Sequence, residues 1–132
     1  MNRLVAGEAQ LFHTGGWQGR LGILAAHTGN VMDRQEVVEL GETIDFTALR
    51  AYRLAAGKRT REIVSELQPM DLKQKVQQER LQIIVEEGAV APSAMGLIEY
   101  WGKRTIAGML LMPPTRHNFV HLNEAAKLMS RR

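Results

Sequence analysis

Two histidines near the end of the sequence have the spacing of a metal-binding pair. His117 and His121 are four residues apart, so on a helix both imidazoles project from one face, about one turn apart. This spacing lets two imidazoles bind one metal ion, as on the zinc-binding helix of metalloproteases. That motif also requires a glutamate directly after the first histidine, and Asn118 occupies this position. The pattern therefore indicates metal binding and excludes a metalloprotease.

A third histidine, His27, falls within the apolar stripe of a second predicted helix. This helix is expected over residues 18–40, with Leu24 and Val31 on the same side as His27. If it packs face to face with the helix that carries the pair, three imidazoles meet inside the protein. Three neutral imidazoles form a good site for a divalent metal and leave a position open for water or substrate. The alternative is that each histidine is a hydrogen-bonded core residue and no metal binds.

One carboxylate, Glu124, is expected on the same helix face as the pair, three residues after His121. It could serve as a fourth ligand, accept a hydrogen bond from an imidazole N–H, or act as a general base. Pairing with a nearby cation such as Lys127 is an equally good interpretation. Glu124 is therefore a candidate catalytic residue beside the metal ligands His27, His117 and His121.

Glycines and prolines divide the remaining sequence into helices. The predicted helices cover residues 2–12, 18–40, 45–56, 60–67 and 105–129. A double glycine after residue 14 ends the first helix, and Gly57 separates the third helix from the fourth. Thr60 is expected to cap the fourth helix. Residues 70–100 are the least regular part, because glycines and a proline interrupt their helical pattern.

The last helix carries the pair and also contains two consecutive prolines. Its inward-facing stripe is predicted to consist of Ile106, Leu110, Pro113, His117, Val120, His121, Glu124 and Leu128. A proline inside a helix removes a backbone hydrogen bond and costs about 3 kcal/mol unless the helix kinks or restarts. We therefore expect a kink at Pro113-Pro114, one turn before His117.

Composition predicts one all-helical domain over residues 1–132. The chain has 45% apolar residues but only 5% aromatic residues, a balance that suits helices better than sheets. Its net charge of +3 comes from dispersed basic residues, whereas a nucleic-acid-binding surface needs them concentrated. No apolar run approaches the roughly 20 residues of a membrane helix. With no cysteine and no signal peptide at its start, the chain is expected in the cytoplasm, without nucleic-acid or membrane partners.

Two segments resemble the DinB/YfiT-like metalloenzyme superfamily. The segment from Trp17 to His27 is similar to its second helix, in which a tryptophan precedes an apolar run ending in a metal histidine. The segment from Thr105 to Glu124 is similar to its last helix, which carries the histidine pair. The resemblance implies an up-down four-helix bundle, here with a shortened first helix, that often forms a homodimer. It also implies zinc, nickel, manganese or iron, bound by one histidine of the second helix and two of the last.

Some members of this superfamily use their metal to activate a low-molecular-weight thiol such as bacillithiol or mycothiol. The first functional hypothesis is therefore a metal-dependent transferase or hydrolase that acts on a small molecule, with any thiol supplied from outside the cysteine-free chain. The alternative hypotheses are a metal-binding module without turnover and a helical interaction module without metal.

Overall fold

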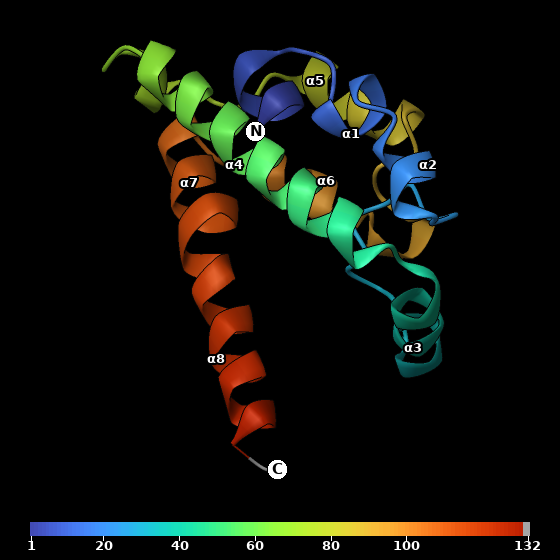
Figure 1. Cartoon of the computed structure of the whole chain (residues 1–132). Coiled ribbons are helices and arrows are strands. Elements are labelled where there is room, and N and C mark those ends of the chain that lie inside the picture. The colour runs from blue at the N-terminus through green and yellow to red at the C-terminus, as the bar shows by residue number, and fades with distance from the viewer. Residues whose placement is uncertain (131–132) are drawn as a thin grey trace.

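Helices make up the regular structure of this protein. The computed structural model describes residues 1–130, which contain no β-strand and no helix long and apolar enough to cross a membrane. The α-helices are α1 (Leu11–Thr14), α2 (Trp17–Leu21), α3 (Arg34–Thr43), α4 (Phe46–Glu66), α5 (Gln78–Glu86), α6 (Gly96–Gly102), α7 (Ile106–Leu111) and α8 (His117–Met129) (Figure 1). Shorter π or 3₁₀ turns are η1 (Asn2–Ala6), η2 (Asp71–Lys73), η3 (Pro92–Ala94) and η4 (Met112–Arg116). The predicted all-α class is confirmed.

One cluster of buried apolar side chains forms the core. Its members come from η1, α4, α5 and α7 and from the segments around them. They are Leu4, Val5, Ile63, Val76, Leu81, Ile84, Ala89, Val90, Ala94, Ile106 and Met109. An isolated antiparallel bridge between Lys75 and Thr105 holds the start of α7 beside the segment that leads into α5. The buried cluster ends at Met109, so α8 lies outside it.

A polar network fastens the N-terminal segment to the end of α5. Arg3 donates to Glu87 at 2.5 Å, and the Gln10 amide donates to the other oxygen of the same carboxylate at 2.6 Å. Arg80 on α5 donates to the carbonyl of Val5 at 2.5 Å. These bonds join parts of the chain more than 70 residues apart, so they fix η1 over the core.

The network predicts a specific dependence of stability on pH. Burial alone would raise the pKa of Glu87, but the hydrogen bonds from Gln10 and Arg3 and the charge of Arg3 outweigh it and lower the pKa below 4.5. Because the pKa is lower in the folded state, this carboxylate stabilises the protein above the unfolded-state pKa, and the stabilisation is lost as the pH falls through the folded-state pKa. We expect Glu87→Gln to lower the free energy of unfolding by about 1–2 kcal/mol at pH 7.

Urea unfolding of the wild type and of Glu87→Gln over a series of pH values tests this prediction. The difference in stability between the two proteins should shrink as the pH falls below 4.5. A difference that stays constant down to acidic pH would show that the ionised carboxylate does not contribute to stability.

The predicted helix over residues 18–40 is wrong, because two local signals divide it. Helix α2 ends at Gly22, which adopts a left-handed backbone with φ 71°, a conformation that ends helices and favours glycine. Helix α3 begins anew at a capping box, in which Asp33 and Glu36 accept hydrogen bonds from each other's backbone N–H groups. Residues 22–33 between them are a loop. Leu24, expected in the apolar stripe, is 97% exposed there.

Helix α4 replaces the two shorter helices predicted over residues 45–56 and 60–67. It starts at Phe46, where the Asp45 side chain accepts from the Ala48 N–H at 2.9 Å. It then continues through Gly57, although glycine inside a helix costs about 1 kcal/mol relative to alanine. Burial of Ile63 in the core stabilises the second half of this helix. Thr60 lies inside the helix and does not cap it.

The two prolines disturb the last helix at the predicted place, because η4 has the wider π geometry between α7 and α8. A proline cannot donate a backbone hydrogen bond, so carbonyls of the preceding turn lose their usual partners. These carbonyls are those of Met109 and Leu110, four positions before the two prolines. The Met109 carbonyl accepts instead from the Met112 N–H, and the Leu110 carbonyl accepts from the Thr115 hydroxyl at 3.4 Å. Other donors in the chain therefore replace the two N–H groups that the prolines lack.

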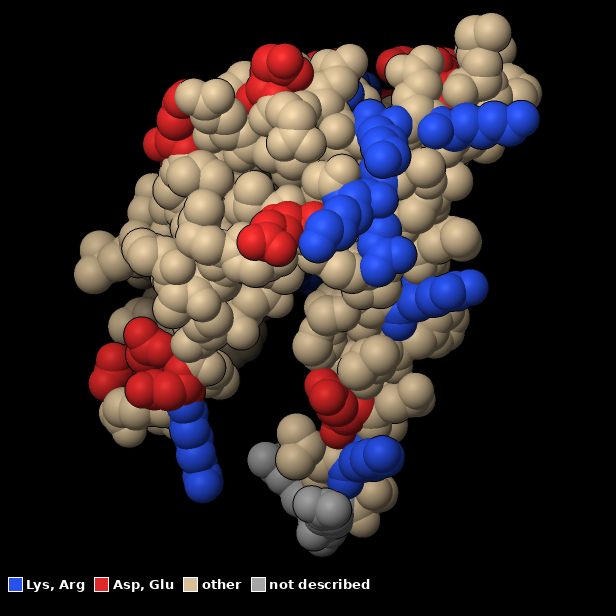
Figure 2. All heavy atoms as spheres, turned by 180° about the vertical axis from the view of Figure 1, so that it is seen from behind, with Lys and Arg blue, Asp and Glu red and all other residues tan. Residues whose placement is uncertain are grey.

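Helices α3 and α8 stand out from the rest of the molecule. Figure 1 shows α8 continuing from α7 away from the other helices, and Figure 2 shows the ends of α3 and α8 as two separate projections. No residue of either helix is buried. The inward-facing stripe predicted for the last helix is therefore correct at Ile106 and wrong on α8, where Val120 and Leu128 are exposed. The side chain of Pro113 lies outside the described side chains.

Candidate metal site

The two imidazoles of the predicted pair face each other on α8. The Nε2 atoms of His117 and His121 lie 3.0 Å apart, and the ring planes are almost perpendicular, at 88°. Both residues belong to a regular α-helix, in which side chains four positions apart are neighbours on the surface. The prediction that the two side chains share one helix face is confirmed.

The Glu124 carboxylate forms a hydrogen bond with Nδ1 of His121, the ring nitrogen that does not face His117. Its Oε2 atom lies 2.9 Å from Nδ1 of His121. With a neutral ring, Nδ1–H donates to the carboxylate, and Nε2 of His121 is left as an acceptor that faces His117. Metal-binding histidines commonly donate their second ring N–H to a carboxylate in this way, which fixes the tautomer and the ring orientation. The structure thus places Glu124 as an orienting group for His121.

The separation of the two Nε2 atoms suits a shared ion. Zinc–imidazole bonds are about 2.0–2.1 Å long, so two nitrogens on one ion at octahedral or tetrahedral angles are about 2.8–3.4 Å apart. The separation of 3.0 Å lies within this range. The same separation is that of a hydrogen bond in which one Nε2–H donates to the other Nε2, so a bound ion would take the place of this proton.

The pair faces solvent. The side chains of His121 and Glu124 are each 62% exposed, and His117 is exposed as well. An ion held there would have only two imidazole ligands from α8, and its other positions would be accessible to water or to a small molecule. Accessible positions are what distinguish catalytic zinc sites from closed structural ones.

His27 does not join the pair. It lies half-buried in the loop between α2 and α3, where its Nδ1 atom accepts a hydrogen bond from the Gly29 N–H at 3.1 Å. The neighbouring Thr28 N–H donates to the carbonyl of Ala89 at 3.0 Å and fixes the loop to another part of the chain. Within residues 1–130, no group of three or more His, Asp or Glu side chains is arranged to hold a metal ion. The expected meeting of three imidazoles is therefore absent, because the helix that was to carry His27 ends at Leu21.

A second feature, a cavity beside α4, was not predicted from the sequence. Its α4 wall is formed by Tyr52, Ala56 and Thr60, which are spaced by four residues and so share one helix face. The same spacing can be seen in the sequence. Because a helix break was expected at Gly57, Tyr52 and Thr60 were assigned to different helices, and their common face was not predicted.

Comparisons of the chain with known protein families, with curated proteins and with solved structures give no match.

Proposed function

We propose that this protein binds a divalent metal ion through Nε2 of His117 and Nε2 of His121. The observation that supports this proposal is the separation of 3.0 Å between the two nitrogens. Imidazole is a ligand suited to zinc, nickel and iron, and a nitrogen site binds nickel and zinc more tightly than manganese. Zinc and nickel are therefore the first choices among the metals that the resemblance to the DinB/YfiT-like superfamily implies.

In this proposal Glu124 orients His121 and does not touch the ion. Its contact with Nδ1 at 2.9 Å supports this role, because an imidazole whose second nitrogen donates to a carboxylate is a more basic ligand. A direct role for Glu124 in proton transfer to a substrate stays a prediction from the sequence.

The proposal extends to a metal-dependent transferase or hydrolase that acts on a small molecule, with or without a low-molecular-weight thiol. A divalent ion acidifies water and thiols that bind to it, and the exposure of the pair gives such molecules access. The resemblance to the DinB/YfiT-like superfamily also predicts an up-down four-helix bundle and a homodimer. These two features, like turnover itself, stay predictions. A metal-binding module without turnover is the alternative.

Calorimetric titration of chelator-treated protein with zinc and nickel tests metal binding directly. We expect saturable binding of one ion per chain for both metals. Magnesium should give no comparable signal, because it prefers oxygen ligands. The matched control is His13→Ala, which removes an exposed histidine of α1 that lies outside the pair. If the wild type gave no saturable signal with either metal, the proposal would be wrong.

A further inference from the structure

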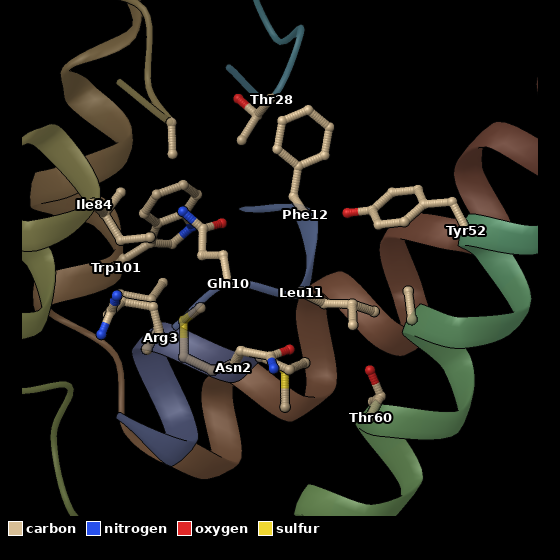
Figure 3. A pocket seen from close by; sticks show the side chains of 15 residues that line it. Asn2, Arg3, Gln10, Leu11, Phe12, Thr28, Tyr52, Thr60, Ile84 and Trp101 are labelled. Atoms are coloured by element: carbon tan, nitrogen blue, oxygen red, sulfur yellow. The ribbon is translucent and has the colours of Figure 1, made fainter. Parts of the chain in front are cut away.

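The cavity beside α4 is a separate candidate binding site. It has a volume of about 260 Å³ and lies between the N-terminal segment, α1, α4 and the start of the segment that follows α5 (Figure 3). Its lining contains neither His117 nor His121. Small-molecule sites are usually concave and mostly apolar, with a few polar groups that orient the ligand. The walls of this cavity meet both conditions.

The α4 wall supplies the polar groups. Tyr52 and Thr60 each present a hydroxyl group, two helical turns apart, and the small side chain of Ala56 lies between them. Figure 3 shows the Tyr52 hydroxyl directed toward Phe12 and the cavity. Burial raises the pKa of Tyr52, so this hydroxyl stays neutral and able to donate. Among residues 1–130, neither hydroxyl forms a hydrogen bond to another protein group.

The opposite walls supply flat apolar surfaces. Phe12 packs edge-to-face against Tyr52, with ring centroids 6.0 Å apart and an interplanar angle of 72°. Trp101 and Ile84 line the side that faces α4 (Figure 3). Aromatic walls of this kind favour a planar ligand, because offset and edge-to-face ring contacts add to the burial of apolar area.

The charges at the cavity favour a neutral ligand. Arg3 is the one charged side chain of its lining, and the ion pair with Glu87 at 2.5 Å balances its charge. The Nε atom of Arg3 is buried without a hydrogen-bond partner among the described residues and is left to donate to a neutral acceptor. Met1 also belongs to the lining, and burial lowers the pKa of its α-amino group, which favours the neutral amine. A ligand anion would have to compete with this ion pair, and a ligand cation would lie beside Arg3 without a partner. Burying an uncompensated charge is strongly unfavourable, so the site suits a neutral molecule.

We propose that this cavity binds a neutral, planar aromatic molecule with a single hydroxyl group, which hydrogen-bonds to Tyr52. An engineered apolar cavity of about 150 Å³ holds one benzene ring. The cavity beside α4, at about 260 Å³, therefore has room for two fused rings. Its function would be to hold or sense such a compound, independently of the metal pair.

The probes are 2-naphthol, its isostere 2-methylnaphthalene and the anion 2-naphthoate, each measured by equilibrium dialysis in the presence of a metal chelator. We expect saturable binding of one 2-naphthol per chain and at least tenfold weaker binding of 2-naphthoate. Tyr52→Phe should weaken 2-naphthol binding about 2- to 10-fold and leave 2-methylnaphthalene unchanged. Ala56→Leu, which fills the cavity, should weaken both neutral probes, whereas Lys58→Leu on the exposed side of α4 should weaken neither.

Two results would overturn the proposal. The first is the absence of saturable 2-naphthol binding by the wild type. The second is an equal effect of Tyr52→Phe on the affinities of 2-naphthol and 2-methylnaphthalene. Equal effects would show that the hydroxyl group of 2-naphthol forms no hydrogen bond with Tyr52. Tyr52→Phe is conservative enough to keep the test decisive even if Ala56→Leu disturbs folding. Because the chelator is present throughout, failure here is distinguishable from failure of the metal proposal.

Discussion

Replacing Ile63 with alanine should lower the free energy of unfolding by about 2–5 kcal/mol, the range found for large-to-small substitutions in well-packed cores. Ile63 is 2% exposed and lies where α4 meets the buried cluster of η1, α5 and α7. The substitution removes buried methyl and methylene groups and leaves a void that rigid neighbours fill only in part. This loss is a large share of the 5–15 kcal/mol by which domains of this size are stable.

Val64→Ala is the matched control for this substitution. Val64 follows Ile63 on the same helix but is 43% exposed, so both variants exchange a β-branched residue for the best helix former. Urea unfolding followed by circular dichroism should show a change within about 0.5 kcal/mol for Val64→Ala. Equal losses for the two variants would mean that α4 does not pack on the core through Ile63.

Substituting either member of the histidine pair with alanine should weaken zinc or nickel binding at least 100-fold. Each variant leaves a single exposed imidazole on α8, and even the loss of a group that only orients a ligand costs about 10- to 100-fold in metal affinity. Calorimetric titration of His117→Ala and His121→Ala measures this loss. Wild-type affinity in either variant would exclude the pair as the site.

Two further variants separate the direct ligands from their surroundings. Glu124→Gln retains the shape of the side chain but removes its charge, so binding should weaken by about 10-fold, which is less than the effect of losing a ligand. His27→Ala should leave the affinity unchanged, because His27 lies in the loop between α2 and α3 and its Nδ1 atom is occupied by Gly29. A large loss of affinity in His27→Ala would show that this loop moves to the metal.

The sequence predicted the helical class and the histidine pair, because both depend on local patterns. Side chains four residues apart meet on any helix, so the contact between His117 and His121 needed no knowledge of the tertiary fold. The third imidazole did depend on tertiary structure, since it required two long helices to pack face to face. Gly22 and the Asp33–Glu36 capping box signal the break in the first of these helices. The apolar residues of 18–40 keep a helical period across this break, although the backbone between Gly22 and Asp33 is not helical.

The wrong inward stripe on α8 has a tertiary cause. Continuing one apolar period from Ile106 to Leu128 assumes that other helices cover the whole length of the last helix. The buried cluster ends at Met109, and no residue of α8 is buried, so no face of α8 points into the core. An apolar period indicates which side chains share a helix face, and it does not show whether another element packs against that face.

The attachment of α8 through η4 separates the chemistry of the histidine pair from the folding of the remaining protein. The buried cluster ends at Met109, and no side chain of α8 is buried. An ion that bridges one turn of α8 would tighten that turn alone and would contribute little to the cooperative unfolding of the core. Substitutions on α8 could therefore change or abolish metal binding and leave the free energy of unfolding of the core almost unchanged.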